Sequence, residues 1–374
     1  MDSNEKNPKI LMFSGDPHVA NKESWVTKRL FLYSGVTDYL DVIVLLPLSF
    51  SDYVKERLSV FSTHTTFKLF SYILGFFRAL FLKKTYTLIT SHDPFFIGII
   101  AYAVSRLKGV PLEIQIHTDI FSPYFEKSGA LQTYRLKIAD FLLKRAERIR
   151  VVAPRLKEAI LKKYKERKEE TITVLPVLSS IGEIDAHRPQ IDLHKKYPQF
   201  DFIMLMLSRL ESEKSIMTAL LAFKEVIKEY PHIGLVIVGN GSQKGELQNF
   251  CKEHNLPVIF EGWTEDPYSY FKTADLFLLT SLFEGYGLTL IEAAAAHCPI
   301  VTTDVGLVGS ILTDDAVFVC PPEDATCLAE RVTALLGNAA VRSARSIAAF
   351  KEIKKHVIEN PDDFLPLLKK SWTV

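Results

Sequence analysis

The chain has 374 residues, with 45 lysines and arginines against 44 aspartates and glutamates, and a formal net charge of +1 at pH 7. A balance this close to neutral excludes a general nucleic-acid binder, which needs basic side chains along the whole phosphate track. The chain is longer than one ordinary domain, and its hydrophobic content of 48% is enough for two cores, so we expect two domains.

Four cysteines lie in the second half of the chain, with neither paired nor metal-ligand spacing: Cys251, Cys298, Cys320 and Cys327. We predict that they are reduced, buried thiols of a cytosolic protein. The N-terminal segment MDSNEKNPK is polar and lacks the apolar region of a secretion signal. No apolar run reaches the roughly 20 residues of a membrane span, so we expect a protein that is soluble or attached to a membrane surface.

The first half of the chain alternates predicted strands with predicted helices, which is typical of an α/β domain. We expect strands at residues 9–13, 41–46, 86–90, 112–116, 149–153 and 171–175, and helices at residues 23–33, 95–104, 131–146 and 155–170. The turn after the first strand contains Gly15 and Asp16 but no G-x-G-x-x-G run, so no dinucleotide site is expected there. This turn either faces a ligand cleft or is an ordinary turn at a strand end.

Residues 67–84 (FKLFSYILGFFRALFLKK) have apolar side chains nearly all round a predicted helix, with Arg78 at one side and two lysines at the end. One interpretation is a helix packed under the sheet. The other is a helix at a membrane surface, with aromatic side chains in the lipid boundary and Lys83 and Lys84 at the head groups. The sequence leaves both interpretations open.

His117 and Asp119 directly follow the predicted strand at residues 112–116. Open α/β sheets bind ligands at the carboxyl ends of their strands, so both side chains are placed to project into one crevice. A lone histidine is more often structural, but this position favours a role in a site.

Proline and glycine residues between 176 and 198 indicate a linker, and we place the domain boundary near residues 178–200. The expected division is residues 1–180, residues 181–360, and a final helix at residues 361–374. This last helix either crosses back onto the first domain or packs on its own domain.

The second half begins with a predicted strand at residues 202–207, which delivers Arg209 and Lys214 to the mouth of a second sheet. Two cations that flank a strand-to-helix turn suit a diphosphate. The alternative is a pair of surface cations neutralised by Glu211 and Glu213.

Further strands are expected at residues 234–238, 258–260, 276–279 and 300–303, with helices at residues 215–230, 244–254 and 267–274. Gly239 lies in a turn after a strand that would approach a phosphate or a base. Trp263 follows another strand, where its ring or backbone would lie beside a base.

Residues 275–303 read as strand, glycine-containing loop, helix and strand, which is one βαβ unit. Glu284 lies in the loop, between a strand and a helix that begins near Leu288. Glu292 is the only charge in a helix of leucine, isoleucine and alanine, and such a charge is usually paired or functional. We expect the two carboxylates to hold different parts of one extended ligand; the alternative is a loop glutamate and a solvated helix glutamate.

Four motifs in the second half are in the order and spacing of one enzyme family: SRL at 208–210 with Lys214, VGNG at 238–241, FEG at 260–262, and SLFEGYGL at 281–288 running to Glu292. With these motifs the chain resembles the retaining glycosyltransferases of family 4. The resemblance implies an α/β fold of the GT-B architecture, with two facing Rossmann-like domains, parallel sheets and an interdomain cleft. The first domain would be the acceptor side, and the second would bind a nucleotide sugar.

The resemblance also implies roles for individual residues. Arg209 and Lys214, with the amides near Gly287 and Leu288, would hold the donor diphosphate. Glu284 would bind the donor sugar and Glu292 the ribose. His117 would approach the donor sugar from the first domain and, with Glu284, be a catalytic candidate; Gly15, Asp16, Asp119, Gly239 and Trp263 would be further cleft candidates.

The function implied is transfer of a hexosyl group, with retention, from a nucleotide-diphosphate sugar to a saccharide or lipid-linked acceptor in cell-envelope or exopolysaccharide biosynthesis. The donor, of UDP or GDP type, is a substrate, and neither a cofactor nor a metal is expected. The expected location is the cytoplasm, with contact to the inner face of the membrane as an additional option. Two alternatives remain: an epimerase-like enzyme that modifies nucleotide sugars, and a non-catalytic binding scaffold.

Overall fold

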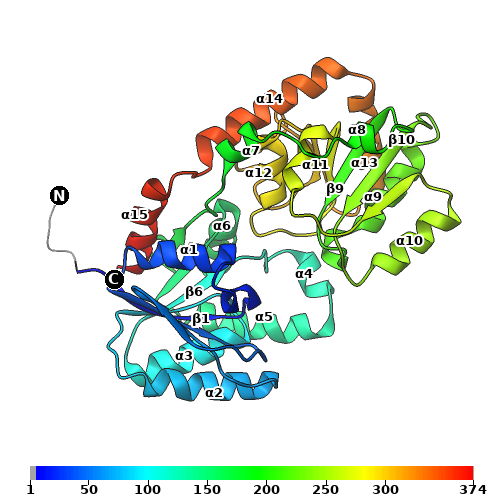
Figure 1. The fold of residues 1–374 in the computed structure, drawn as a ribbon. Helices are drawn as coiled ribbons and strands as arrows, with labels where there is room; N and C mark the ends of the chain where they lie inside the picture. The colour runs from blue at the N-terminus through cyan, green and yellow to red at the C-terminus, as the bar shows by residue number, and fades with distance from the viewer. Residues whose placement is uncertain (1–5, 374) are drawn as a thin grey trace. The chain divides into compact units, whose positions relative to one another are not determined.

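The computed structural model describes residues 6–373 and divides into two compact units (Figure 1). The first unit runs up to Phe121, resumes from Gly129 to Pro176, and takes in the chain from Asn360 onward. The second unit consists of Ser122–Ser128 and Val177–Glu359. The main change of unit therefore falls a few residues before the boundary placed after residue 180.

The first unit is built on an eight-stranded sheet with the order β3-β4-β2-β1-β5-β6-β7-β8. Its strands are β1 (Lys9–Ser14), β2 (Tyr39–Val44), β3 (Tyr53–Lys55), β4 (Leu58–Phe61), β5 (Leu88–Ser91), β6 (Leu112–Ile116), β7 (Arg148–Val151) and β8 (Ile172–Val174). The central strands are runs of apolar, often β-branched residues that are buried on both faces, which is typical of a parallel sheet covered by helices. The sheet is parallel except at one edge, where β3 pairs with β4 in the antiparallel sense.

Helices cover both faces of this sheet; α2 and α3 lie on one face, and α1 and α15 on the other (Figure 1). The helical segments of the unit are η1 (Pro17–Ala20), α1 (Trp25–Ser34), α2 (Lys68–Phe81), α3 (Phe96–Lys108), α5 (Ala130–Leu143), α6 (Pro154–Lys163), η2 (Glu169–Thr171) and α15 (Pro361–Trp372). The C-terminal helix α15 packs on the first unit, where Phe364 stacks on Tyr33 at 5.5 Å between ring centroids. Its last turn is held by Arg148, whose Nη1 donates to the Ser371 carbonyl at 3.2 Å.

The second unit contains a six-stranded, all-parallel sheet with the order β11-β10-β9-β12-β13-β14. Its strands are β9 (Phe202–Leu207), β10 (Ile233–Val238), β11 (Val258–Glu261), β12 (Leu276–Leu279), β13 (Ile300–Thr303) and β14 (Phe318–Cys320). Its helical segments are α4 (Pro123–Lys127), α7 (Ile181–Ala186), α8 (Leu193–Lys196), η3 (Ser212–Lys214), α9 (Ile216–Val226), α10 (Lys244–Glu253), α11 (Pro267–Thr273), α12 (Leu288–Ala295), α13 (Ala325–Leu336) and α14 (Ala339–His356).

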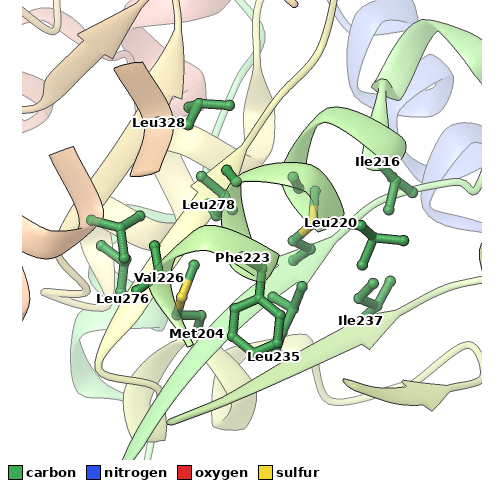
Figure 2. Close-up of a cluster of buried hydrophobic side chains, with 14 of the residues drawn as sticks. Met204, Ile216, Leu220, Phe223, Val226, Leu235, Ile237, Leu276, Leu278 and Leu328 are labelled. Carbon is green, nitrogen blue, oxygen red and sulfur yellow. The ribbon is translucent and has the colours of Figure 1, made fainter. Parts of the chain in front are cut away.

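One large cluster of buried side chains joins this sheet to α9, α10 and α13 (Figure 2). Phe223 of α9 lies at its centre, against Met204 of β9 and Leu235 of β10. Alternate residues of each strand supply the cluster, as a two-residue repeat requires. The core fixes the carboxyl ends of β9 and β12 next to each other, and these ends carry the candidate site.

Three sequence-based expectations differ from the structure. The linker at residues 178–200 contains the helices α7 and α8, and the helix expected at residues 155–170 ends at Lys163. Cys320 and Cys327 form a disulfide with Cα atoms 5.8 Å apart, so not all four cysteines are free. The turn between β14 and α13 brings these two cysteines together although they are seven residues apart. Their spacing in the sequence did not indicate this pairing. Cys251 and Cys298 are free and buried.

Among residues 6–373, no helix combines the length and the apolar character that are needed to cross a bilayer.

Candidate active site

Lys214 is positioned by a clamp between the turn after β9 and the end of β12. It is the last residue of η3, and Ser215, which follows, adopts a left-handed conformation with φ of +47°. The Thr280 hydroxyl at the end of β12 donates to the carbonyls of Lys214 and Ser215, at 2.9 and 3.0 Å. The left-handed residue redirects the chain into α9 and leaves the Lys214 side chain at the edge of the sheet.

Lys214 and Glu284 form an ion pair at this edge. Lys214 Nζ lies 2.5 Å from Glu284 Oε1, and the Ser281 hydroxyl donates to the same oxygen at 2.8 Å. Oε2 of Glu284 accepts no hydrogen bond from the part of the chain that the structure describes. The two charged side chains are only 14% and 17% exposed. An ion pair this far from water costs desolvation free energy, which is a reason to look for a functional role.

The loop that carries Glu284 leads directly into the N-terminus of α12. Gly287 is the N-cap residue, with φ of +90°, a conformation that favours glycine. No side chain caps this helix, so the first amides, from Leu288 onward, have no side-chain acceptor. Uncapped amides at a helix N-terminus attract an anion through their partial positive charge.

The loop after β13 packs against the loop that carries Glu284. Gly306 packs so closely that an added Cβ would lie 2.5 Å from the Tyr286 carbonyl, and its φ is +58°. The Leu307 amide donates to that same carbonyl at 3.1 Å, and the Thr303 hydroxyl donates to the Ser281 carbonyl at 2.6 Å. The Glu284 loop is therefore held on both sides of Glu284 by hydrogen bonds to its backbone carbonyls.

Glu292 lies one turn into α12 and is largely buried. Its carboxylate forms no hydrogen bond or ion pair within residues 6–373. Burial raises its pKa from 4.5 to about 7. Tyr268 lies nearby, and its pKa is raised first by burial and then by the charge of Glu292. A desolvated carboxylate without a protein partner is a characteristic feature of a ligand site.

Arg209 is placed differently from Lys214. Its side chain is 71% exposed, and its Nη2 donates to Glu213 Oε1 at 2.6 Å. In the ligand-free structure, Arg209 is therefore a surface cation that is neutralised by Glu213, as the second interpretation expected. Lys214 is not, because it is mostly buried and pairs with Glu284. Glu211 pairs with neither cation, since its carboxylate accepts from the amide and the hydroxyl of Ser242.

Gly239 and Trp263 lie at the ends of neighbouring strands of the same sheet. Gly239 has a φ of +139°, and an added Cβ would lie 2.0 Å from the Ser208 carbonyl, so close packing of β9 and β10 requires glycine. Trp263 follows β11 and is 74% exposed. Among the described residues, no hydrogen bond, ion pair or ring contact joins either one to the Lys214–Glu284 pair.

His117 in the first unit begins a buried chain of hydrogen bonds. Its Nε2 lies 3.0 Å from Gln115 Oε1, Gln115 Nε2 donates to Thr90 Oγ at 2.8 Å, and Thr90 donates to Glu113 Oε1 at 2.7 Å. A carboxylate only accepts hydrogen bonds, so the single Thr90 proton belongs to Glu113. Thr90 must then accept from the Gln115 amide, and Gln115 Oε1 must accept from His117. The chain therefore places the proton of a neutral His117 on Nε2 and leaves Nδ1 unprotonated.

The surrounding protein favours the neutral form of His117. His117 keeps exposed surface, yet desolvation by the surrounding protein lowers its pKa well below 6.5, and repulsion from Arg150 and Arg29 adds to the effect. His92 lies 6.0 Å away between ring centroids, and burial lowers its pKa in the same direction. His92 was not predicted as a site residue, although it too directly follows a strand, β5.

The remaining candidates of the first unit serve local turns. Asp16 caps η1, since its Oδ1 accepts from the His18 amide at 2.9 Å. Asp119 accepts in the same way from the Phe121 amide, also at 2.9 Å. Gly15 packs close to α3, where an added Cβ would lie 2.6 Å from Ile97 Cδ1. The interpretation as an ordinary strand-end turn accounts for the contacts of Asp16.

Two Rossmann-like units, the second with a lysine, a glutamate and an uncapped helix at the carboxyl edge of its sheet, have the architecture of a GT-B glycosyltransferase. Residues 189–352 match the family model "Glycosyl transferases group 1", and residues 52–177 match "Glycosyl transferase 4-like domain". The two matches fall on the two units, so each unit is similar to a domain of known glycosyltransferases.

Two curated proteins illustrate the similarity. The chain is 33% identical over 165 residues to the poly(glycerol-phosphate) alpha-glucosyltransferase of Bacillus subtilis. The matched region covers 42% of this chain and 24% of that protein. It is 27% identical over 259 residues to the alpha-monoglucosyldiacylglycerol synthase of Streptococcus pneumoniae, with 64% of this chain and 57% of that protein covered. The chain thus spans about a quarter to somewhat over half of the length of these relatives.

A solved structure extends the similarity of fold to nearly the whole chain. The Anabaena protein Alr3699/HepE, determined in complex with UDP and glucose, matches 97% of this chain and 99% of its own, with a TM-score of 0.74. The sequence identity is 18%, so this match bears on the fold alone.

Proposed function

We propose that this protein is a retaining, family 4 glycosyltransferase that moves a hexosyl group from a UDP- or GDP-sugar to a saccharide or lipid-linked acceptor in cell-envelope or exopolysaccharide biosynthesis. The observation that carries the proposal is the Lys214–Glu284 pair, which lies beside the uncapped N-terminus of α12. The names of the two curated relatives, an alpha-glucosyltransferase and an alpha-monoglucosyldiacylglycerol synthase, support it. We place the enzyme in the cytoplasm, at the inner face of the membrane.

In this proposal the donor diphosphate binds to Lys214, to Arg209 and to the first amides of α12. Arg209 would exchange Glu213 for a phosphate oxygen, which an exposed side chain can do at little cost. Breaking the bond between sugar and phosphate develops negative charge on the departing diphosphate. Cations and amides that are already in place stabilise this charge more in the transition state than in the ground state.

The two carboxylates then serve the uncharged parts of the donor. Glu284 would accept from sugar hydroxyls through Oε2, while Oε1 stays with Lys214 and Ser281. Glu292, whose carboxylate has no partner within residues 6–373, would accept from the ribose hydroxyls. We assign Glu284 no role as a covalent nucleophile, because its charge is already shared with a lysine. Retention would follow from attack on the same face, with the leaving phosphate helping to deprotonate the acceptor.

The experiment that tests the function is a donor screen with the full-length protein, followed by analysis of the product anomer by NMR. We expect turnover with one UDP- or GDP-hexose, an unchanged rate after removal of divalent cations with EDTA, and an α-linked product from an α-configured donor. A β-linked product would refute retention. Isomerised donor in the absence of acceptor would identify the epimerase-like alternative, and binding without turnover would identify the scaffold.

A further prediction concerns His117, to which we assign a role in the transfer step. Gln115→Met removes the acceptor that holds the Nε2 proton and retains the length of the side chain. We expect kcat to fall by about tenfold with KM little changed, since a misoriented general base or hydrogen-bonding group typically loses a factor of this order. Steady-state kinetics measure the split, and Gln115→Glu, which restores an acceptor, should recover part of kcat. A change in KM alone would contradict the positioning role.

A further inference from the structure

Helix α2 has its small residues inside and its large apolar residues outside. The buried positions are Ser71, Gly75 and Ala79, which are four residues apart and share one face. Seven large apolar side chains in and next to the helix are exposed: Phe67, Leu69, Phe70, Ile73, Leu74, Phe77 and Phe81. A helix that only covers a sheet has the opposite arrangement.

Close packing against the sheet causes this arrangement. At Gly75 an added Cβ would lie 2.1 Å from Leu45 Cδ2 and 3.5 Å from a methyl group of Ile43, so the backbone of α2 sits directly on β2 and the residue after it. No large side chain fits beneath the helix at this separation. The exposed aromatic residues therefore cannot turn inward without lifting the helix off the sheet.

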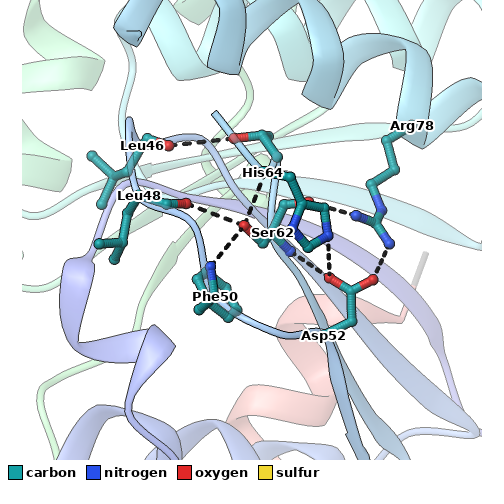
Figure 3. A network of polar contacts seen from close by, with 8 residues as sticks. Leu46, Leu48, Phe50, Asp52, Ser62, His64 and Arg78 are labelled. Atoms are coloured by element: carbon teal, nitrogen blue, oxygen red, sulfur yellow. Dashed lines mark hydrogen bonds and ion pairs between the residues drawn. The ribbon is translucent and has the colours of Figure 1, made fainter. Parts of the chain in front are cut away.

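Arg78 fixes the rotation of the helix about its axis. Its guanidinium donates to the Ser62 carbonyl and to Asp52 Oδ2, and it lies 4.8 Å from the ring centroid of Phe61 (Figure 3). Asp52 also accepts from the Ser62 amide at 2.9 Å and lies 3.4 Å from His64 Nε2. The arginine in the last turn of the helix is thus neutralised at the inner edge, and the outer face stays apolar.

The charges around the patch favour an anionic partner. The segment from residue 57 to residue 92 contains no aspartate or glutamate. Lys68 and Lys83 flank the two ends of α2, and neither forms an ion pair within residues 6–373, whereas Lys84 pairs with Asp41 at 2.9 Å. The apolar face continues onto α3, where Phe96 stacks on Tyr72 at 6.4 Å. Asp93, just beyond this segment, interacts electrostatically with Lys68, whereas Lys83 has no such acid in the described residues. A large exposed apolar patch marks an interaction surface, and basic side chains at its ends match lipid phosphates.

We propose that α2 attaches the first unit to an anionic lipid bilayer, with the helix lying in the plane of the surface. The aromatic and aliphatic side chains enter the boundary between head groups and acyl chains, and Lys68 and Lys83 contact the phosphates. This contact answers the question that the sequence left open for residues 67–84. It rests on the membrane location in the proposed function, but its test is separate from the test of sugar transfer, because donor binding does not require lipid.

Vesicle flotation of the full-length protein tests the proposal, with phosphatidylcholine vesicles and vesicles that also contain phosphatidylglycerol. We expect the protein to float with the anionic vesicles and to dissociate as the salt concentration rises. Phe77→Glu and Phe81→Glu change exposed residues, so the fold should persist, and each should weaken binding by about tenfold or more. Lys68→Glu combined with Lys83→Glu should abolish the preference for anionic vesicles.

The matched control is Ile347→Glu, which changes an equally exposed apolar residue on α14 and should bind like the wild type. Equal flotation of the wild type and Phe77→Glu would overturn the proposal, as would absence of the wild type from both kinds of vesicle. A wild-type dimer that Phe77→Glu converts to a monomer, without lipid binding by either, would identify a second copy as the occupant and also overturn it. The affinity for nucleotide, measured by calorimetry, should be unchanged in all these variants. A failure of lipid binding can therefore be told apart from a failure of donor binding.

Discussion

Replacing Glu284 by glutamine is expected to lower kcat/KM for sugar transfer by about 100-fold or more, a loss of roughly 3 kcal/mol of transition-state stabilisation. The amide keeps the shape of the side chain but loses the charge that holds Lys214 at 2.5 Å and that would accept from the donor sugar. Initial rates with the donor found in the screen measure the effect. Activity within about threefold of the wild type would exclude a direct role for this residue.

A stability control separates a functional pair from a structural one. Glu284→Gln and Lys214→Met should each lower the melting temperature, because each leaves a mostly buried partner unpaired. The double variant should recover part of the lost stability while transfer remains lost. If the double variant recovered activity together with stability, the pair would be structural only. The exposed pair of Lys228 and Glu225 is the matched control, and its removal should change stability by about 0.5 kcal/mol or less.

Glu292→Gln is expected to stabilise the ligand-free protein at pH 8, by about 3 kcal/mol, because it removes a desolvated charge. The pKa of Glu292 is raised from 4.5 to about 7 on folding, so between these values the folded state holds a proton that the unfolded state has released. The stability of the wild type therefore falls as the pH rises through this window, and the loss is complete above pH 7. At pH 4 the two proteins should be nearly equal. Denaturant unfolding at both pH values measures the difference, and an equal difference at both would contradict a desolvated carboxylate.

The same residue links donor binding to proton release. Ribose hydroxyls donate to an ionised carboxylate, so nucleotide binding should lower the pKa of Glu292 and release a proton below about pH 7. Wild-type affinity should then rise from pH 6 to pH 8, whereas the affinity of Glu292→Gln should be weaker and insensitive to pH. Calorimetry in buffers of different ionisation enthalpy counts the protons released. No proton release by the wild type would remove Glu292 from the ribose site.

Much of the second sheet could be predicted because its strands are marked locally. The strands expected at residues 202–207, 276–279 and 300–303 have those bounds in the structure. Each is a short apolar run between turn-forming residues, and each is buried on both faces. The helix that begins at Leu288 follows a glycine that the structure places in a left-handed conformation. These signals lie within a few residues of the elements that they define.

The features that could not be predicted depend on strand register and side-chain packing. The strand β3 is only three residues long, and its pairing with β4 has no apolar alternation to indicate it. Lys214, rather than Arg209, pairs with Glu284 because a left-handed Ser215 and the Thr280 hydroxyl set its position.

The buried path from His117 to Glu113 crosses from β6 to β5 and back, and no local pattern shows which strands are neighbours. The exposed apolar face of α2 could not be predicted either, because it also depends on how the helix packs. Composition shows that the helix is apolar, but only the contact between Gly75 and Leu45 shows which side packs on the sheet.

Calorimetric titration of the full-length protein with UDP and with GDP tests most directly whether Lys214 belongs to a donor diphosphate site. We expect the wild type to bind one of the two nucleotides, Lys214→Met to bind it at least about 30-fold more weakly, and the exposed control Lys228→Met to bind it as the wild type does. Equal affinity of Lys214→Met and the wild type would contradict the assignment of this edge of the second sheet to the donor.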